Sequence, residues 1–210
     1  MARPNVRRDE RVRAAMLAHA AEIFGRNTRG FHGTPTSRLG KDEARYFTYF
    51  ENKEGLLREM FHEYWRCMLS KAREIEAQRS DPVERLSSLL DLTIDVYREK
   101  EDLFRVTTLN CYPGEIPGLA PGCTDALRFR SIALGAIAEA RRAGRLRNPA
   151  TTDELVFLTL VGATQQLLNE HYRQAHLEPK DEADRRDRTP ALDLIHILRQ
   201  LRLLVGAFFE

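Results

Sequence analysis

The sequence predicts an all-α protein of about nine helices, with a small N-terminal three-helix module ahead of a larger C-terminal helical bundle. Apolar residues recur at helical spacing almost throughout, and no segment alternates between polar and apolar residues as a half-buried strand would. Charge divides along the chain: residues 1–50 carry ten basic and five acidic residues, net +5, whereas residues 51–210 carry 23 basic and 26 acidic residues, net −3. A basic head on a slightly acidic body is typical of a nucleic-acid-binding module joined to a domain with another role, although a solvated basic surface would give the same count. We therefore expect one domain at residues 1–55 and a second at residues 56–210.

Composition argues against membrane and secreted classes. The chain has no run of about 18 apolar residues that could span a bilayer, so we expect no membrane partner. Its N-terminus is basic but lacks the long apolar stretch of a secretory signal. The three cysteines, Cys67, Cys111 and Cys123, form no C-x-x-C pair, which favours reduced thiols in the cytoplasm.

The N-terminal module begins with a predicted helix at residues 9–25. Its apolar positions form one buried stripe of Val12, Met16, Ala20 and Ile23 or Phe24.

Short elements follow, because residues 27–40 are rich in Gly, Thr and Pro. Thr34-Pro35 can begin a short helix, with threonine as the cap and proline in the first turn, and Gly40 would end it. Asp42 can cap a second helix that runs to residue 50.

Asn52 can cap a third, long helix that runs to about residue 78. Its apolar face is wide enough to require wrapping by other helices. That face consists of Leu56, Leu57, Met60, Phe61, Tyr64, Trp65, Met68 and Leu69.

The body continues with a helix opened by Ser80-Asp81-Pro82, whose apolar stripe is Leu86, Leu89, Leu90, Ile94 and Tyr97. An apolar segment at residues 103–112 precedes a loop at residues 113–122, which holds three Pro-Gly pairs. A helix over residues 124–143 should end at Gly144 in the left-handed conformation.

The last two helices are apolar on more than one face. Thr151 and Glu154 form a capping-box pattern before a helix at about residues 152–176, and Thr189-Pro190 opens another at about 189–208. The charged linker between them, residues 176–188, should be a mobile loop. Such apolar surface predicts a two-fold homodimer formed through these helices, and burial inside a monomer is the alternative.

Three short helices within the first 50 residues, basic and interrupted by a glycine, favour a helix-turn-helix. The stretch from residue 40 to residue 57 resembles the second half of that motif in the tetracycline-repressor (TetR) family, and residues 20–31 resemble the end of its first helix. The matching positions are Gly40, Asp42, Tyr46, Phe47, Tyr49, Phe50, Lys53, Leu56 and Leu57. The specific resemblance covers residues 11–57, and the outline covers the whole chain.

This resemblance implies a ligand-responsive transcriptional regulator, expected to be a repressor, that binds a pseudo-palindromic operator in double-stranded DNA as a dimer. Arg45 and Thr48 would reach base edges or nearby phosphates, and Glu43 could accept a hydrogen bond from a cytosine amine. The remaining expected contacts are to phosphates, from Tyr49, Lys53, Lys41 and an N-terminal arm of Arg7, Arg8 and Arg11. The alternative for each of these side chains is a solvated surface residue, and for Tyr49 it is an aromatic residue in the core of the motif.

The resemblance also implies a pocket in the body for a small, largely apolar ligand that has not been identified. Its expected lining is Phe61, Trp65, Met68, Tyr97, Phe104, Tyr112 and Phe129, with His62 or Cys111 as polar anchors. Ordinary core packing is the alternative for each of them. We expect no cofactor and no metal.

Departures from the family pattern support an alternative function. About four residues are missing between Gly30 and Phe50, roughly one helical turn. The position after the glycine is Lys41 rather than an apolar residue, and Phe47 replaces a phosphate-contacting tyrosine. The alternative is a helical dimer of the same ancestry whose degenerate head has lost normal DNA binding and which acts by binding a ligand or a protein.

Two further functional classes fit the sequence less well. An enzyme finds little support, because the six histidines are scattered and no phosphate-binding loop or nucleophile motif is present. A thiol sensor could use Cys111 and Cys123, which flank the Pro-Gly loop, but inert thiols explain the same pattern.

Overall fold

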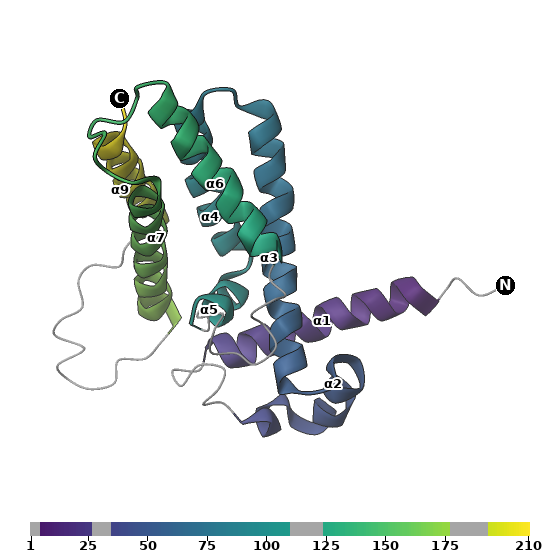
Figure 1. Ribbon diagram of the computed structural model, residues 1–210. Helices are drawn as coiled ribbons and strands as arrows, with labels where there is room; N and C mark the ends of the chain where they lie inside the picture. Colours follow the sequence, from purple (N-terminus) through teal and green to yellow (C-terminus); the bar gives the residue numbers. More distant parts are fainter. Residues whose placement is uncertain (1–4, 27–34, 110–123, 177–192) are drawn as a thin grey trace, which may run out of the picture. The chain divides into compact units, whose positions relative to one another are not determined.

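The computed structural model describes residues 5–26, 35–109, 124–176 and 193–210 (Figure 1). Within these ranges the chain forms eight α-helices and one 3₁₀-helix, and its only β-type pairing is an isolated bridge between Leu146 and Phe209. The predicted all-α class is therefore confirmed. No helix in this part of the chain combines the length and the apolar character needed to cross a bilayer. The Pro-Gly loop at residues 113–122 and nearly all of the charged linker lie outside the described residues.

The chain divides into two compact units. Unit 1 comprises Met1–Tyr64 and Lys100–Cys123, and unit 2 comprises Trp65–Glu99 and Thr124–Glu210. The chain passes between the units within helix α3, between helices α4 and α5, and directly before helix α6. A functional boundary at residue 55 stays a prediction, because this division reflects contacts alone.

Unit 1 is organised around α1 (Asn5–Gly25), which packs against α5 (Glu101–Leu109). Met16, Ala20 and Phe24 of the predicted stripe are buried. At the end of α1, a Cβ added to Gly25 would lie 2.7 Å from the carbonyl oxygen of Asp102, so a side chain there would clash with α5. The Arg105 side chain also donates from Nε to the Gly25 carbonyl at 3.1 Å.

The short second element differs from the prediction in type and in start. It is a 3₁₀-helix, η1 (Thr36–Asp42), with Pro35 at the N-cap position and no side-chain cap. The helical path breaks at Gly40 (φ 70°, ψ −148°), a conformation open to glycine alone, so glycine is the stop that the sequence indicated. The 3₁₀ geometry is tighter than the α-helix and is common in short pieces. Thr34 lies outside the described residues.

The next two helices begin and end close to the predicted positions. α2 (Glu43–Phe50) starts directly after Asp42, the predicted cap, whose side chain is not among those described. α3 (Lys53–Gln78) is capped by Asn52, whose Oδ1 accepts from the backbone amide of Gly55 at 2.7 Å. The predicted wide face of α3 is buried apart from Trp65, which is half-buried.

Unit 2 contains α4 (Pro82–Glu99), α6 (Thr124–Arg142), α7 (Asp153–His176) and α9 (Leu194–Phe208), together with the second half of α3. α4 packs against α6 and α9, and α7 also packs against α6 and α9 (Figure 1).

The predicted cap and stop signals of unit 2 are confirmed at α4 and α6. Asp81 Oδ1 accepts from the amides of Val83 (2.9 Å) and Glu84 (2.8 Å), and every residue of the predicted α4 stripe is buried. Gly144 (φ 72°) ends α6 as expected. Its amide bonds to the Arg141 carbonyl and the next amide bonds to the Ala140 carbonyl, which is the Schellman arrangement.

Two predicted helix starts need correction. α7 is capped by Thr152, not by Thr151, because Thr152 Oγ1 accepts from the Leu155 amide at 3.2 Å. Glu154, the expected partner in a capping box, pairs instead with Arg130 of α6 at 2.9 Å. α9 is capped by Asp193, whose side chain accepts from the Ile195 amide at 3.2 Å, so the described helix begins after the predicted Thr189-Pro190 start.

Candidate functional site

The exposed face of α2 is the strongest candidate site in unit 1. Within this eight-residue helix Tyr46 and Phe50 are buried, whereas Ala44, Arg45 and Thr48 are exposed. Because successive residues turn by about 100° in an α-helix, residues 44 and 48 lie roughly opposite residue 46. α2 therefore fixes an apolar face in unit 1 and presents a short, mostly polar face to solvent.

The buried face of α2 is held by side chains from α1 and α3. Tyr46 Oη lies 2.6 Å from His19 Nδ1, a hydrogen bond between α1 and α2. The Arg13 guanidinium lies over the Phe50 ring, 5.4 Å from its centroid, and pairs with Glu59 of α3 at 2.6 Å. Sequence reasoning did not single out His19 or Arg13. Tyr46 itself was the available signal, since a buried hydroxyl needs a partner.

A tight turn joins α2 to α3. Glu51 adopts the left-handed conformation (φ 65°), and the Asn52 amide bonds to the Phe50 carbonyl at 2.7 Å. A Cβ added to Gly55 would lie 2.0 Å from the same carbonyl oxygen, so only glycine fits there. The turn thereby fixes the direction of α2 relative to the start of α3.

Lys53, at the start of α3, is half-buried with Nζ 5.8 Å from the centroid of the Phe24 ring. Burial lowers the pKa of its ammonium group, and the neighbouring Glu54 carboxylate offsets part of that change. The side chain is thus a cation that has already lost part of its hydration, which lowers the cost of a further contact.

The other predicted DNA contacts fall into three groups. Arg11, Lys41, Arg45 and Thr48 are exposed, and Thr48 Oγ1 also donates to the Ala44 carbonyl at 3.1 Å. Glu43 and Tyr49 are half-buried, with the Tyr49 ring 6.3 Å from that of Phe50. Arg7 and Arg8 have their backbone in α1, and their side chains lie outside the described part. α1, η1, α2 and the start of α3 contribute these residues, all of which belong to unit 1.

The predicted ligand-binding residues are divided between the two units. In unit 1, Phe61 and Phe104 are buried and His62 is half-buried. In unit 2, Met68, Tyr97 and Phe129 are buried, and the half-buried Trp65 lies 5.7 Å from the Phe129 ring. Tyr112 and Cys111 lie outside the described residues.

Tyr97 brings one polar group into the interior of unit 2. Its hydroxyl lies 2.7 Å from Nδ1 of His171, and the two rings meet edge to face with centroids 5.4 Å apart. The sequence did not indicate this pairing of α4 with α7.

The hollows in the described parts of the chain include the following two. One of about 400 Å³ is lined by His19, Glu22, Ile23, Arg26 and Arg38, and one of about 340 Å³ lies at the start of α4 among charged side chains. Neither is lined by a predicted ligand residue, so the ligand site stays a prediction. No group of acidic, histidine and cysteine side chains among the described residues could hold a metal ion.

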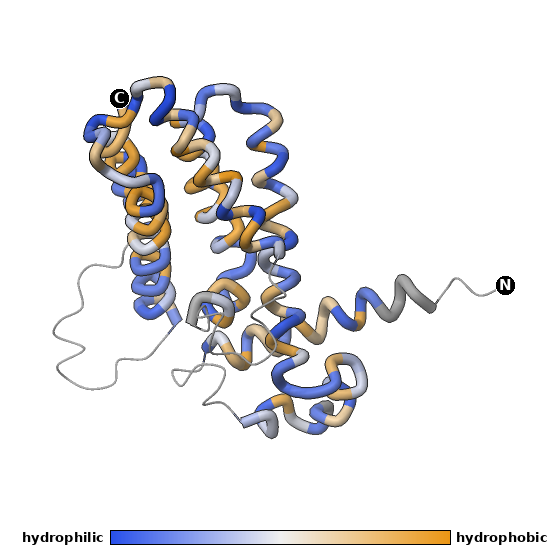
Figure 2. Tube along the Cα trace, viewed as in Figure 1, coloured by the Kyte–Doolittle hydropathy of each residue, from blue (hydrophilic) through white to orange (hydrophobic). Residues whose placement is uncertain are grey.

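α7 and α9 carry large apolar side chains on their exposed surface. Leu155 (54% exposed) and Leu158 (60%) lie on α7, and Ile195 (64%) and Leu203 (63%) lie on α9. Figure 2 shows hydrophobic residues along much of both helices. We refer to these four residues as the apolar patch.

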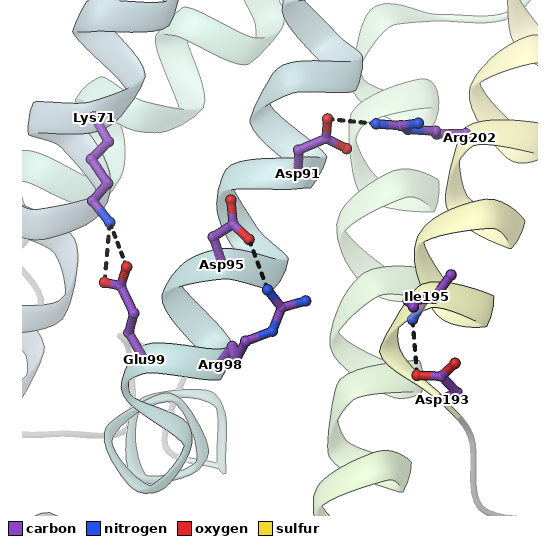
Figure 3. A network of polar contacts seen from close by, with 8 residues as sticks. All are labelled: Lys71, Asp91, Asp95, Arg98, Glu99, Asp193, Ile195 and Arg202. Carbon is purple, nitrogen blue, oxygen red and sulfur yellow. Dashed lines mark hydrogen bonds and ion pairs between the residues drawn. The ribbon is translucent and has the colours of Figure 1, made fainter.

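Ion pairs also link the helices of unit 2. Arg202 of α9 donates to Asp91 of α4 at 2.8 Å, and Lys71 of α3 lies 3.1 Å from Glu99 of α4 (Figure 3). The Glu99 carboxylate raises the pKa of Lys71. The second oxygen of Asp91 is buried and has no hydrogen-bond partner in the described structure.

Solved transcriptional regulators are similar to this chain over most of its length. PfmR, a TetR-family regulator from Thermus thermophilus, is 14% identical with a TM-score of 0.64, and the match covers 93% of this chain and 98% of PfmR. FadR from Bacillus subtilis, solved with stearoyl-CoA, is 17% identical with a TM-score of 0.66 over 90% of this chain and 95% of FadR. KstR2 of Mycobacterium tuberculosis, a ketosteroid transcriptional regulator, is 16% identical with a TM-score of 0.64 over 94% and 95%. The sequence matches no protein-family model and no curated protein. The chain therefore has the TetR-like fold.

Proposed function

We propose that this chain is a ligand-responsive transcriptional regulator, without enzymatic activity, that binds double-stranded DNA as a homodimer in the cytoplasm. The observation that carries the proposal is the exposed face of α2, where Arg45 and Thr48 point away from the buried Tyr46 and Phe50. The TetR-like fold supports it, because the structures it resembles are transcriptional regulators.

In this proposal α2 enters the major groove. Arg45 can donate to guanine O6 and N7, and the Thr48 hydroxyl can form a hydrogen bond with either a purine or a pyrimidine edge. The exposed Ala44 is small enough to let the helix approach a thymine methyl group. Glu43, in the first turn of α2, can accept from a cytosine amine. Together these side chains would read a few adjacent base pairs.

Phosphate contacts would come from the rim of the same surface. Lys41 and Arg11 are exposed cations, and Lys53 is partly desolvated at the start of α3. Tyr49 can donate its phenol hydroxyl to a phosphate oxygen. Arg7 and Arg8 would add attraction that does not depend on sequence.

Dimerisation would use the apolar patch, extended by the rest of α7 and α9. These leucine and isoleucine side chains are more than half exposed on two neighbouring helices, which favours a partner surface. A two-fold pair is the commonest arrangement that supplies one. Two copies of α2 would then read a pseudo-palindromic operator. As a repressor, the dimer would block transcription when it occupies that operator.

The ligand we propose is small and largely apolar. FadR was solved with stearoyl-CoA and KstR2 is a ketosteroid regulator, which supports an apolar compound without naming it. The candidate residues remain Phe61, His62, Trp65, Met68, Tyr97, Phe104, Tyr112 and Phe129. Such a ligand would act by binding one arrangement of the dimer more tightly than the other.

Arg45→Ala tests the proposal on a duplex enriched from a random pool. If Arg45 reads a base, its removal should cost about 1–3 kcal/mol of binding free energy. Arg73→Ala is the matched control, since Arg73 is an exposed arginine on the far half of α3, in unit 2. Equal affinity of the two variants would remove Arg45 from the site.

Two observations favour the alternative function. η1 is a 3₁₀-helix broken at Gly40, and acidic residues stand where α2 begins, at Asp42 and Glu43. A carboxylate near a helix N-terminus stabilises the helix but repels phosphate. Failure of the wild-type dimer to enrich any sequence would favour a helical dimer that acts through a ligand or a protein.

A further inference from the structure

η1 packs against α2 but offers it little buried side-chain surface. Of the described side chains of η1 only Leu39 is buried, and the helical path is interrupted at Gly40. In a helix-turn-helix the first helix of the pair normally holds the second one at a fixed angle. Here α2 has further support from another part of unit 1.

α1 provides it through two contacts on the buried face of α2. His19 Nδ1 lies 2.6 Å from Tyr46 Oη, and the Arg13 guanidinium covers the Phe50 ring at 5.4 Å. Glu59 of α3 holds Arg13 in place at 2.6 Å. The Tyr46 ring is itself 6.4 Å from the Phe50 ring, so the two contacts form one connected cluster.

The two contacts are separated along both helices. Tyr46 and Phe50 are about one turn apart on α2, and Arg13 and His19 are six residues, or about 9 Å, apart on α1. Two separated anchors fix the rotation of a short helix about its axis as well as its tilt. Without the His19 bond, the contact of Arg13 with Phe50 would be the remaining one of these two anchors, and it does not by itself fix the rotation of α2.

On the basis of the proposed function, we infer that His19 is a positioning residue for DNA recognition. Through Tyr46 it fixes the rotation of α2, and hence the direction in which Arg45 and Thr48 approach base edges. His19 therefore affects how well the protein distinguishes one DNA sequence from another. Hydrogen bonds to base edges depend on the exact direction of the side chain, whereas attraction to phosphates carries no sequence information. Attraction to the DNA backbone does not depend on it.

The test uses His19→Ala, Tyr46→Phe and the double variant of the full chain. Each is titrated into a duplex enriched by the wild type and into an unrelated duplex of equal length, at two salt concentrations. We expect each single variant to lose about five- to ten-fold in affinity for the enriched duplex, which is the value of one hydrogen bond. Affinity for the unrelated duplex and the salt dependence stay unchanged, and the double variant loses no more than the larger single loss. His19→Gln, which can still bond to the hydroxyl, recovers most of the affinity.

Equal losses on both duplexes, or single losses that add in the double variant, would overturn the inference. A measurement without DNA separates it from the proposed function. The Glu51 amide, bonded to the Phe47 carbonyl at 3.0 Å, reports on the last turn of α2 by hydrogen exchange. It should exchange faster in His19→Ala while the interior of α4 is unaffected. A wild type that binds no duplex overturns the proposed function, whereas unchanged exchange in His19→Ala overturns the positioning role itself.

Discussion

Gly55→Ala should destabilise the protein, although alanine is the better helix former. The added Cβ would lie 2.0 Å from the Phe50 carbonyl oxygen, where real contacts stay above 3.0 Å, so the backbone must move by at least 1.0 Å. Forcing an atom into such a site costs about 1–3 kcal/mol. The shift also disturbs the 2.7 Å bond from the Gly55 amide to Asn52, a cap worth about 1 kcal/mol. Alanine's helix propensity returns about 1 kcal/mol, which leaves a net loss of about 1–3 kcal/mol.

Gly135→Ala is the matched control for this prediction. Gly135 lies within α6, and a Cβ there would meet no atom within 4 Å. The same substitution should therefore stabilise the protein by about 0.5–1 kcal/mol. Urea unfolding followed by circular dichroism, at one protein concentration, measures both changes. If Gly55→Ala were as stable as Gly135→Ala, the close approach of α3 to the Phe50 carbonyl would be disproved.

The remaining predictions concern unit 2. The amide of Glu84, aided by the Arg145 guanidinium at 2.9 Å, holds the pKa of Asp81 below its usual value. Because the pKa of Asp81 is lower in the folded state, its carboxylate stabilises the fold. This stabilisation is fully present above the unfolded-state pKa of about 3.9 and is lost as pH falls through the folded-state pKa. Asp81→Asn keeps a capping side chain but loses the charge. The difference between its free energy of unfolding and that of the wild type, measured with urea, should be constant from about pH 5 upward and shrink below about pH 4. A difference that does not depend on pH would contradict this. Leu158→Glu should convert the dimer to a monomer in sedimentation, while Leu127→Glu, equally exposed on α6 but outside the apolar patch, should stay dimeric. Two dimeric variants would place the interface elsewhere.

Local signals predicted the helices of this chain well. Asp81 and Asn52 cap helices, and Gly144 ends one, because these interactions lie within a few residues of sequence. The same locality explains the error at Thr151. Two adjacent threonines offer equivalent caps, and the choice of Thr152 depends on where α7 packs.

The side-chain contacts between helices far apart in the sequence could not be predicted in the same way. His19 and Tyr46 are 27 residues apart, and Tyr97 and His171 are 74 apart. Their pairing follows from how helices cross, which helical periodicity does not encode. The 3₁₀ form of η1 was missed for a related reason. A short segment can form either an α-helical turn or a 3₁₀-helix, and its packing on α1 and α2 decides between the two.

Selection of bound duplexes from a random pool, at two salt concentrations, is the most direct test of whether the exposed face of α2 reads DNA. DNA recognition by α2 predicts enrichment of one pseudo-palindromic site whose half-sites are about one helical turn apart, with affinity that falls steeply as salt rises. Recovery of unenriched sequence at both concentrations, or no binding at all, would contradict it.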